Sequence, residues 1–151
     1  LQQYEAYRDA CVKASQELYR LHFPKIGCVI MASGLGKRFG SNKLMADFHG
    51  KPMIQRALDA SEGLFSGRVV VTRHESVAAL CREQNVDVVL HDLPNRNDTI
   101  RLGLEALGDV DACMFLPGDQ PLLRRETVAM LLESRKEIPD SNSRTYRKII
   151  P

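Results

Sequence analysis

Residues 26–51 read IGCVIMASGLGKRFGSNKLMADFHGK, and this stretch decides the fold. It opens with an apolar run, Ile26–Met31, and a short apolar run bounded by turn residues is typical of a buried parallel strand. The run passes into Gly34 and Gly36, where the backbone can approach a ligand with no Cβ in the way. Successive amide N–H groups in such a turn form an anion-binding nest. The stretch therefore predicts a core strand that leads into an anion-binding loop.

Cationic side chains follow the glycines. Lys37, Arg38 and Lys43 place formal charge where a polyphosphate would lie. Neither common phosphate loop fits the spacing. A Walker loop would need Ser or Thr at Arg38, and the dinucleotide fingerprint would need its third glycine at Phe39. The pattern indicates a third kind of phosphate loop.

Composition narrows the class of protein. The chain has 151 residues, with 44% hydrophobic and 26% charged residues, which predicts one soluble domain with its own core. A net charge of +2 does not indicate nucleic-acid binding, and no apolar run reaches membrane-span length. The cysteines form no CxxC pair and no secretory leader is visible, so we expect a cytoplasmic protein without structural zinc. Because the chain starts at Leu1 and stops at Pro151, we expect it to be partial.

Helices and strands alternate along the rest of the chain. Helices are predicted at 2–22, 52–64, 76–84, 98–107 and 125–137, and strands at 26–31, 68–72, 86–90 and 112–116. Pro52, Ser76 and either Asp98 or Thr99 are expected at or near helix starts, and 148–150 begins a further strand after a polar segment at 139–147. This alternation predicts a parallel sheet, and such sheets bind ligands at the carboxyl ends of their strands.

The N-terminal helix has two interpretations. Its apolar residues recur at alternating spacings of three and four, which gives it one apolar stripe. The favoured interpretation is a helix that packs on the domain or leads from an upstream fused domain. The alternative is an oligomerisation seam. We therefore divide the chain into a helix or connector, 1–24, and a domain, 25–151.

The segment Leu116-Pro117-Gly118-Asp119-Gln120-Pro121-Leu122 follows the fourth predicted strand. An aspartate after a strand is often only a turn residue. Here Gly118 and Pro121 would hold the backbone so that the carboxylate stays at the sheet edge, where the glycine loop also ends. Mg²⁺ prefers one or two carboxylates together with phosphate oxygens, so Asp119 is the candidate metal ligand.

Other reactive side chains carry no pattern of their own. His22, His49, His74 and His91 are scattered, and each is predicted to be a surface or loop residue rather than a metal ligand. Cys81 lies in a predicted helix with no nearby histidine in sequence, so no nucleophilic role is indicated.

These motifs together resemble the MobA-like nucleotidyltransferases over roughly residues 26–132. The matching segments are Ala32–Gly40, Asn42-Lys43-Leu44, Gly50-Lys51-Pro52, Asp98–Leu104 and Gly118–Leu122. The resemblance implies a three-layer, Rossmann-like (GT-A-like) α/β fold with a mostly parallel sheet and Mg²⁺ in the site. Such proteins continue with a Gly-His/Asn-Pro stretch and a further acidic ligand. Neither motif occurs before Pro151, which suggests a C-terminally incomplete domain.

The resemblance also implies roles for individual residues. Arg38, Lys43 and Asp119 would be catalytic, and Asp119 would bind the metal. Asp98 stands where the family pattern has a serine, which leaves the contact there open. The nucleotide-binding residues would be Ala32, Ser33, Gly34, Leu35, Gly36, Lys37, Arg38, Lys43, Thr99, Gly103 and Gly118.

The resemblance implies nucleotidyl transfer to molybdopterin cofactor, and the tetrad Met31-Ala32-Ser33-Gly34 together with the segment Gly118–Leu122 favours CTP as the nucleotide. Family members that use CTP have Ala at the third place and those that use GTP have Gly, and Ser33 keeps a Cβ that leaves less room for a purine. We therefore expect Mg²⁺-dependent transfer of CMP from CTP to molybdopterin cofactor, with release of pyrophosphate. The alternatives are a guanylyltransferase of the same cofactor, a cytidylyltransferase of a sugar or polyol phosphate, and a nucleotide-binding module of a larger protein.

Overall fold

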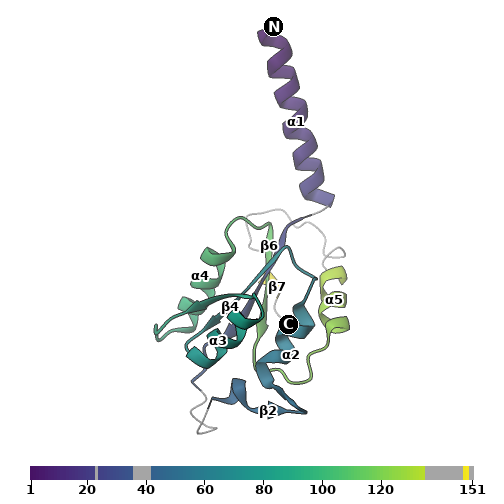
Figure 1. Cartoon of the computed structure of the whole chain (residues 1–151). Helices are drawn as coiled ribbons and strands as arrows, with labels where there is room; N and C mark the ends of the chain where they lie inside the picture. The colour runs from purple at the N-terminus through teal and green to yellow at the C-terminus, as the bar shows by residue number, and fades with distance from the viewer. Residues whose placement is uncertain (23, 36–41, 135–147, 150–151) are drawn as a thin grey trace.

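The computed structural model describes residues 1–22, 24–35, 42–134 and 148–149 (Figure 1). In chain order its elements are α1 (Gln2–His22), β1 (Ile26–Ala32), the 3-10 turn η1 (Lys43–Met45), β2 (Asp47–Phe48), β3 (Lys51–Pro52), α2 (Met53–Ser61), β4 (Gly67–Thr72), α3 (Glu75–Glu83), β5 (Asp87–Leu90), α4 (Arg96–Leu107), β6 (Ala112–Pro117), α5 (Arg125–Ser134) and β7 (Lys148–Ile149).

A parallel sheet in the order β5-β4-β1-β6-β7 forms the centre of the molecule. β1 lies between β4 and β6, so Ile30 pairs with Val70 on one edge and Leu116 on the other. A strand paired on both edges and covered on both faces must be apolar throughout, as the Ile26–Met31 run indicated. The predicted parallel α/β sheet is confirmed.

Alternate residues of β1 face two different helix layers. Cys28, Ile30 and Ala32 join a core cluster with residues of α2, α3 and α5, whereas Val29 packs with residues of α4. Figure 1 shows α4 and α5 on opposite sides of the strands. α4 approaches closely because Gly103 has no side chain. A Cβ there would lie 2.5 Å from Cγ1 of Val29. The result is the expected three-layer architecture.

The chain between β1 and α2 contains structure that periodicity did not predict. Asn42 caps η1 by accepting a hydrogen bond from the backbone N–H of Leu44 at 3.2 Å. β2 and β3 then form a two-residue hairpin whose turn residues, His49 and Gly50, have φ values of 53° and 82°. Positive φ at both positions is the signature of a type I′ turn. These strands have two residues each, too few for an alternating pattern.

Some helices begin earlier than their sequence signals suggested. α3 begins at Glu75 with His74 as its N-cap, not at Ser76. Thr72 Oγ1 accepts the N–H of His74 at 3.1 Å and turns the chain early. α4 begins at Arg96 after Asn95, not at Asp98 or Thr99. Asp98 is instead the third residue of a capping box, and its carboxylate accepts the N–H of Asn95 at 3.3 Å.

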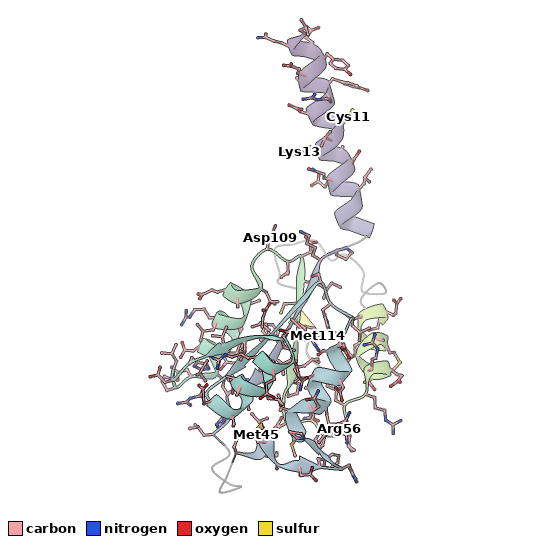
Figure 2. The ribbon with its side chains drawn as sticks, viewed as in Figure 1. Cys11, Lys13, Met45, Arg56, Asp109 and Met114 are labelled. Atoms are coloured by element: carbon pink, nitrogen blue, oxygen red, sulfur yellow. The ribbon has the colours of Figure 1, made fainter. Side chains whose placement is uncertain are left out.

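α1 projects away from the sheet, and its described side chains are exposed (Figures 1 and 2). Cys11 and Lys13 lie on this projecting helix, whereas Met114 lies within the sheet (Figure 2). The predicted helix is confirmed, but its apolar stripe does not pack on the described part of the domain, with Tyr4 69% and Tyr7 70% exposed. The division at residue 24 stays a prediction. Among the described residues, no helix combines the length and apolar character needed to cross a membrane.

Candidate active site

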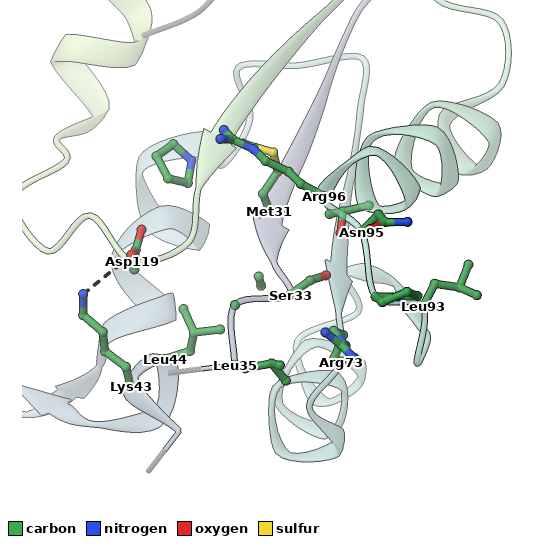
Figure 3. Close-up of a pocket in the computed structure, with 15 residues that line it drawn as sticks. Met31, Ser33, Leu35, Lys43, Leu44, Arg73, Leu93, Asn95, Arg96 and Asp119 are labelled. Atoms are coloured by element: carbon green, nitrogen blue, oxygen red, sulfur yellow. Dashed lines mark ion pairs between the residues drawn. The ribbon is translucent and has the colours of Figure 1, made fainter. Parts of the chain in front are cut away.

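A pocket of about 830 Å³ opens at the carboxyl ends of the strands (Figure 3). The ends of β1, β4 and β6, the start of η1 and the loop from β5 into α4 form its walls. Its lining residues are Met31, Ala32, Ser33, Gly34, Leu35, Lys43, Leu44, Arg73, Leu93, Pro94, Asn95, Arg96, Thr99, Pro117 and Asp119. This is the edge at which parallel sheets bind ligands, and where the glycine loop and Asp119 were expected to meet.

Lys43 and Asp119 form an ion pair at one end of the pocket (Figure 3). Lys43 Nζ lies 3.6 Å from Asp119 Oδ2, and the two side chains are 42% and 48% exposed. Exposed pairs contribute little to stability, so this pair has small structural value and remains open to a ligand. Asn42 fixes the start of η1 by donating to Ser76 Oγ at 2.9 Å, which sets the position of Lys43.

Gly118 brings Asp119 to this position. Its backbone N–H donates to the carbonyl oxygen of Met31 at 2.9 Å, which ties the end of β6 to the end of β1. A Cβ on Gly118 would lie 3.1 Å from that carbonyl oxygen and 2.8 Å from Cδ1 of Ile54. Gly118 is buried and does not line the pocket, so its visible role is the close approach that delivers Asp119.

The first part of the glycine loop is held from the β4 side. Thr72 Oγ1 donates to the carbonyl oxygen of Ala32 at 2.9 Å, and Nε2 of His74 lies 2.7 Å from the carbonyl oxygen of Gly34. A carbonyl only accepts, so Nε2 of His74 carries a proton. A Cβ on Gly34 would meet no atom of the described residues within 4 Å, so the described part of the pocket leaves this side open for a ligand. His74, expected to be a surface or loop residue, therefore also has a structural role in the loop.

Ser33 contacts a second histidine. Its Oγ donates to the carbonyl oxygen of Val71 at 3.1 Å and lies 2.8 Å from Nε2 of His91. Burial, followed by the charge of Arg73, lowers the pKa of His91, against the opposing effects of Asp98 and Asp92. Ser33 is therefore fixed in orientation at the mouth of the loop.

Two cations of the pocket were missed from sequence. Arg73 follows β4 directly, and Arg96 is the first residue of α4. Nη2 of Arg73 donates to the carbonyl oxygen of Asp92 at 3.4 Å. Neither residue belongs to a glycine-rich motif, but the position of Arg73 after a parallel strand was a signal that could have placed it at the ligand edge.

The sequence-predicted residues fall into three groups. Ala32, Ser33, Gly34, Leu35, Lys43, Thr99 and Asp119 line one pocket. Gly118 and Gly103 do not line it. Gly103 lies on the face of α4 that packs against Val29 of β1. Its predicted contact with a nucleotide stays a prediction. Gly36, Lys37 and Arg38 lie outside the described residues.

The residues around Asp119 fit a divalent cation that is held jointly with a substrate. Asp119 is the one carboxylate among the described lining residues, and the described ranges hold no cluster of three or more His, Cys, Asp or Glu that could form a closed metal site. Mg²⁺ needs only one or two carboxylates when phosphate oxygens and waters complete its shell. The half-exposed Asp119 side chain meets that requirement.

The buried cysteines are not suited to nucleophilic chemistry. Burial raises the pKa of Cys81 and of Cys113 to about 11, and it raises the pKa of Cys28 further, with an added contribution from Cys113. A thiol with such a pKa stays protonated at neutral pH.

The fold and the site together define the class. The described site places the start of the glycine loop, a lysine and an aspartate at the carboxyl edge of a parallel sheet, which is the combination that the resemblance to nucleotidyltransferases predicted. A nucleotidyl transferase from Methanothermobacter thermautotroptrophicus shares the fold, with a TM-score of 0.62 and 24% identity over 72% of this chain and 57% of that one. Residues 28–145 match the MobA-like NTP transferase domain, and the chain belongs to that family.

Two curated relatives are both nucleotidyltransferases by name, but their names give different substrates. The chain is 31% identical over 121 residues to a probable molybdenum cofactor guanylyltransferase of Aquifex aeolicus, covering 80% of this chain and 58% of that protein. It is 31% identical over 121 residues to the 2-C-methyl-D-erythritol 4-phosphate cytidylyltransferase of Dehalococcoides mccartyi, covering 74% and 53%. The chain thus spans little more than half the length of these relatives.

Proposed function

We propose that the pocket binds a nucleoside triphosphate and transfers its nucleoside monophosphate to a phosphorylated acceptor. The observation that carries this proposal is the meeting of Lys43 and Asp119 beside the start of the glycine loop, in one open pocket. In the reaction, an acceptor phosphate oxygen forms a bond to the α-phosphorus while the bond to the pyrophosphate oxygen breaks, and pyrophosphate leaves. No covalent enzyme intermediate is required.

Each residue then has a defined task. The N–H groups of the glycine loop and Arg38 hold the phosphates, and Lys43 neutralises charge that develops on the α-phosphate. Asp119 would hold Mg²⁺, and the bound ion would supply charge neutralisation to the phosphate oxygens. Catalysis consists of positioning and charge stabilisation, as in other transfers of phosphorus groups.

The favoured substrates are CTP and molybdopterin cofactor. Ser33 lines the pocket and keeps a Cβ beside the start of the glycine loop, which favours the smaller base. The likeness to a probable molybdenum cofactor guanylyltransferase supports the cofactor as acceptor and makes GTP the competing nucleotide. If the chain binds but does not turn over, it serves as the nucleotide-binding module of a larger protein.

A specific observation also favours a sugar or polyol phosphate as acceptor. Arg96 and Thr99, from the first turns of α4, both line the pocket, and the chain is 31% identical to a 2-C-methyl-D-erythritol 4-phosphate cytidylyltransferase. Comparing that sugar alcohol phosphate with molybdopterin cofactor as acceptor, with CTP present, separates the two candidates.

Calorimetry of CTP, GTP and ATP, with and without Mg²⁺, tests the proposal. We expect Mg²⁺-dependent binding with CTP preferred, and Asp119→Asn should weaken Mg²⁺-dependent binding by about tenfold, the effect of losing one charged ligand. Asp109→Asn is the matched control, because Asp109 is exposed and does not line the pocket. Stronger binding of GTP would select the guanylyl alternative. Absence of binding, or unchanged metal dependence in Asp119→Asn, would contradict the proposed site.

A further inference from the structure

His91 makes a hydrogen bond with each of its ring nitrogens, and the two partners belong to different parts of the pocket. Nε2 lies 2.8 Å from Oγ of Ser33, at the end of β1. Nδ1 accepts the backbone N–H of Leu93 at 3.1 Å, in the loop that leads from β5 into α4. Ser33 and Leu93 both line the pocket, whereas His91 does not.

These bonds fix the protonation of the ring. The N–H of Leu93 can only donate, so Nδ1 carries no proton and the neutral ring has its proton on Nε2. Nε2 therefore donates to Ser33 Oγ, whose own hydroxyl proton goes to the carbonyl oxygen of Val71 at 3.1 Å. The series of hydrogen bonds from Leu93 through His91 and Ser33 to Val71 is complete only when His91 is neutral.

The place of these contacts shows what they control. Lys43 and Asp119 lie at one side of the pocket, where the proposed reaction puts the phosphates, and Leu93 and Asn95 lie at the other (Figure 3). We infer that His91 is a positioning residue for the nucleoside end of the pocket. Its two hydrogen bonds hold the wall at the end of β1, which contains Ser33, at a fixed separation from the wall in the β5–α4 loop, which contains Leu93. This inference rests on the proposed function, because it assumes a nucleotide in this pocket.

The arrangement makes nucleotide binding sensitive to pH. Protonation places a proton on Nδ1, where it would face the N–H of Leu93, so that hydrogen bond is lost. The charged groups that face His91 are Arg73 after β4, Asp98 on α4 and Asp92 on its own loop. Burial and Arg73 together lower the pKa of His91 below its usual 6.5. The hydrogen bonds of neutral His91 therefore join the two walls at pH 7. The bond to Leu93, and with it this connection, is lost only as the pH falls through the lowered pKa of His91.

Three substitutions distinguish the contact of His91 with Ser33 from its contact with Leu93. His91→Asn keeps an acceptor near Nδ1 but cannot reach Ser33, whereas His91→Gln keeps a donor near Nε2 but loses the acceptor for Leu93. Ser33→Ala removes the hydroxyl. At pH 7.5 we expect His91→Asn to raise the dissociation constant of the preferred triphosphate by about five- to tenfold, as loss of one hydrogen bond does. In the Ser33→Ala background the same change should add almost nothing.

The pH profile distinguishes positioning from a general loss of stability. The ratio of the variant's dissociation constant to that of the unmodified chain should fall toward one as the pH drops below the lowered pKa of His91, because losing the Leu93 bond then disconnects the two walls in the unmodified chain as well. Taking this ratio cancels the titration of the triphosphate itself. Gln84→Ala is the matched control, since it removes hydrogen bonds to Gln55 away from the pocket.

The outcomes separate this inference from the proposed function. A ratio of one at every pH, or a tenfold ratio that does not change with pH, would contradict the role of His91 while leaving nucleotide binding intact. Additive effects of Ser33→Ala and His91→Asn would contradict the joining of the two walls. No binding of any triphosphate by the unmodified chain would contradict both the proposed function and this inference.

Discussion

Lys43 is a cation placed beside a carboxylate that is also the candidate metal ligand. Its Nζ lies 3.6 Å from Oδ2 of Asp119, near enough to compete with a divalent cation for that oxygen. The carboxylate of Asp119 therefore favours binding of the metal, whereas the ammonium group of Lys43 opposes it. Removing the lysine removes both charge stabilisation at the α-phosphate and this competition.

This opposition gives a sharp prediction for Lys43→Ala. Turnover should fall by about 10²- to 10³-fold, the usual effect of removing one group that stabilises transition-state charge. The affinity for Mg²⁺ should stay the same or increase. Steady-state kinetics and calorimetry measure the two quantities. Equal losses in turnover and in triphosphate affinity would argue against a transition-state role.

Single residues also show what the sequence could establish about the site. Lys43 and Asp119 were predictable because each stands in a motif at the carboxyl end of a strand, and topology brings such ends together. His91 and Arg73 stand in no motif. Each directly follows a parallel strand, which could have placed it at the ligand edge, but the partners, Ser33 for His91 and Asp92 for Arg73, are set by tertiary packing or by the path of a loop and could not be predicted.

At the scale of elements, α4 rests on the sheet through a glycine. Gly103 allows Val29 of β1 to lie where a side chain would otherwise be, and the same helix presents Thr99 to the pocket one turn earlier. Displacing α4 therefore affects the core and the ligand site together.

Gly103→Ala tests this packing. The added methyl would lie 2.5 Å from Val29 Cγ1, so we expect a loss of about 1–3 kcal/mol in the free energy of unfolding, as for other overpacked cores. Gly67→Ala is the control, because its nearest neighbour would be 3.8 Å away, an ordinary contact. Urea unfolding followed by circular dichroism measures both. A stable Gly103→Ala protein would show that α4 can move without cost.

Elements were predicted well where they are long and apolar. β1, β4, β5 and β6 appear within a residue of the predicted bounds, and a helix appears in each predicted interval, although α2 ends at Ser61 rather than at Leu64. The hairpin of β2 and β3 was not predicted because its strands are too short for a periodic signal. The starts of α3 and α4 shifted because Thr72 and Asp98 make hydrogen bonds that the sequence does not display.

At the scale of the whole molecule, stability resides in the sheet and its helix layers, and α1 contributes little to it. The described side chains of α1 are exposed, whereas Leu58 of α2 is 1% exposed within the core. The helix and the domain should therefore respond differently to loss of apolar surface.

Substituting Tyr4 and Tyr7 together by serine should change the free energy of unfolding of the domain by less than about 0.5 kcal/mol, as for other exposed positions. Leu58→Ala should cost about 2–5 kcal/mol. Both are measured by urea unfolding. A large effect of the tyrosine pair would show that α1 has a partner in solution, such as a second copy of the chain.

The central position of β1 has a consequence for synthesis on the ribosome. Ile26 pairs with Ala112, so β1 emerges early but obtains its second neighbour only after β6 has been made. At roughly 5–20 residues per second, the nascent chain carries an apolar strand with one unpaired edge for several seconds. An unpaired apolar edge is a template for aggregation. We therefore expect this interval, more than the finished fold, to determine how strongly the chain depends on chaperones during expression.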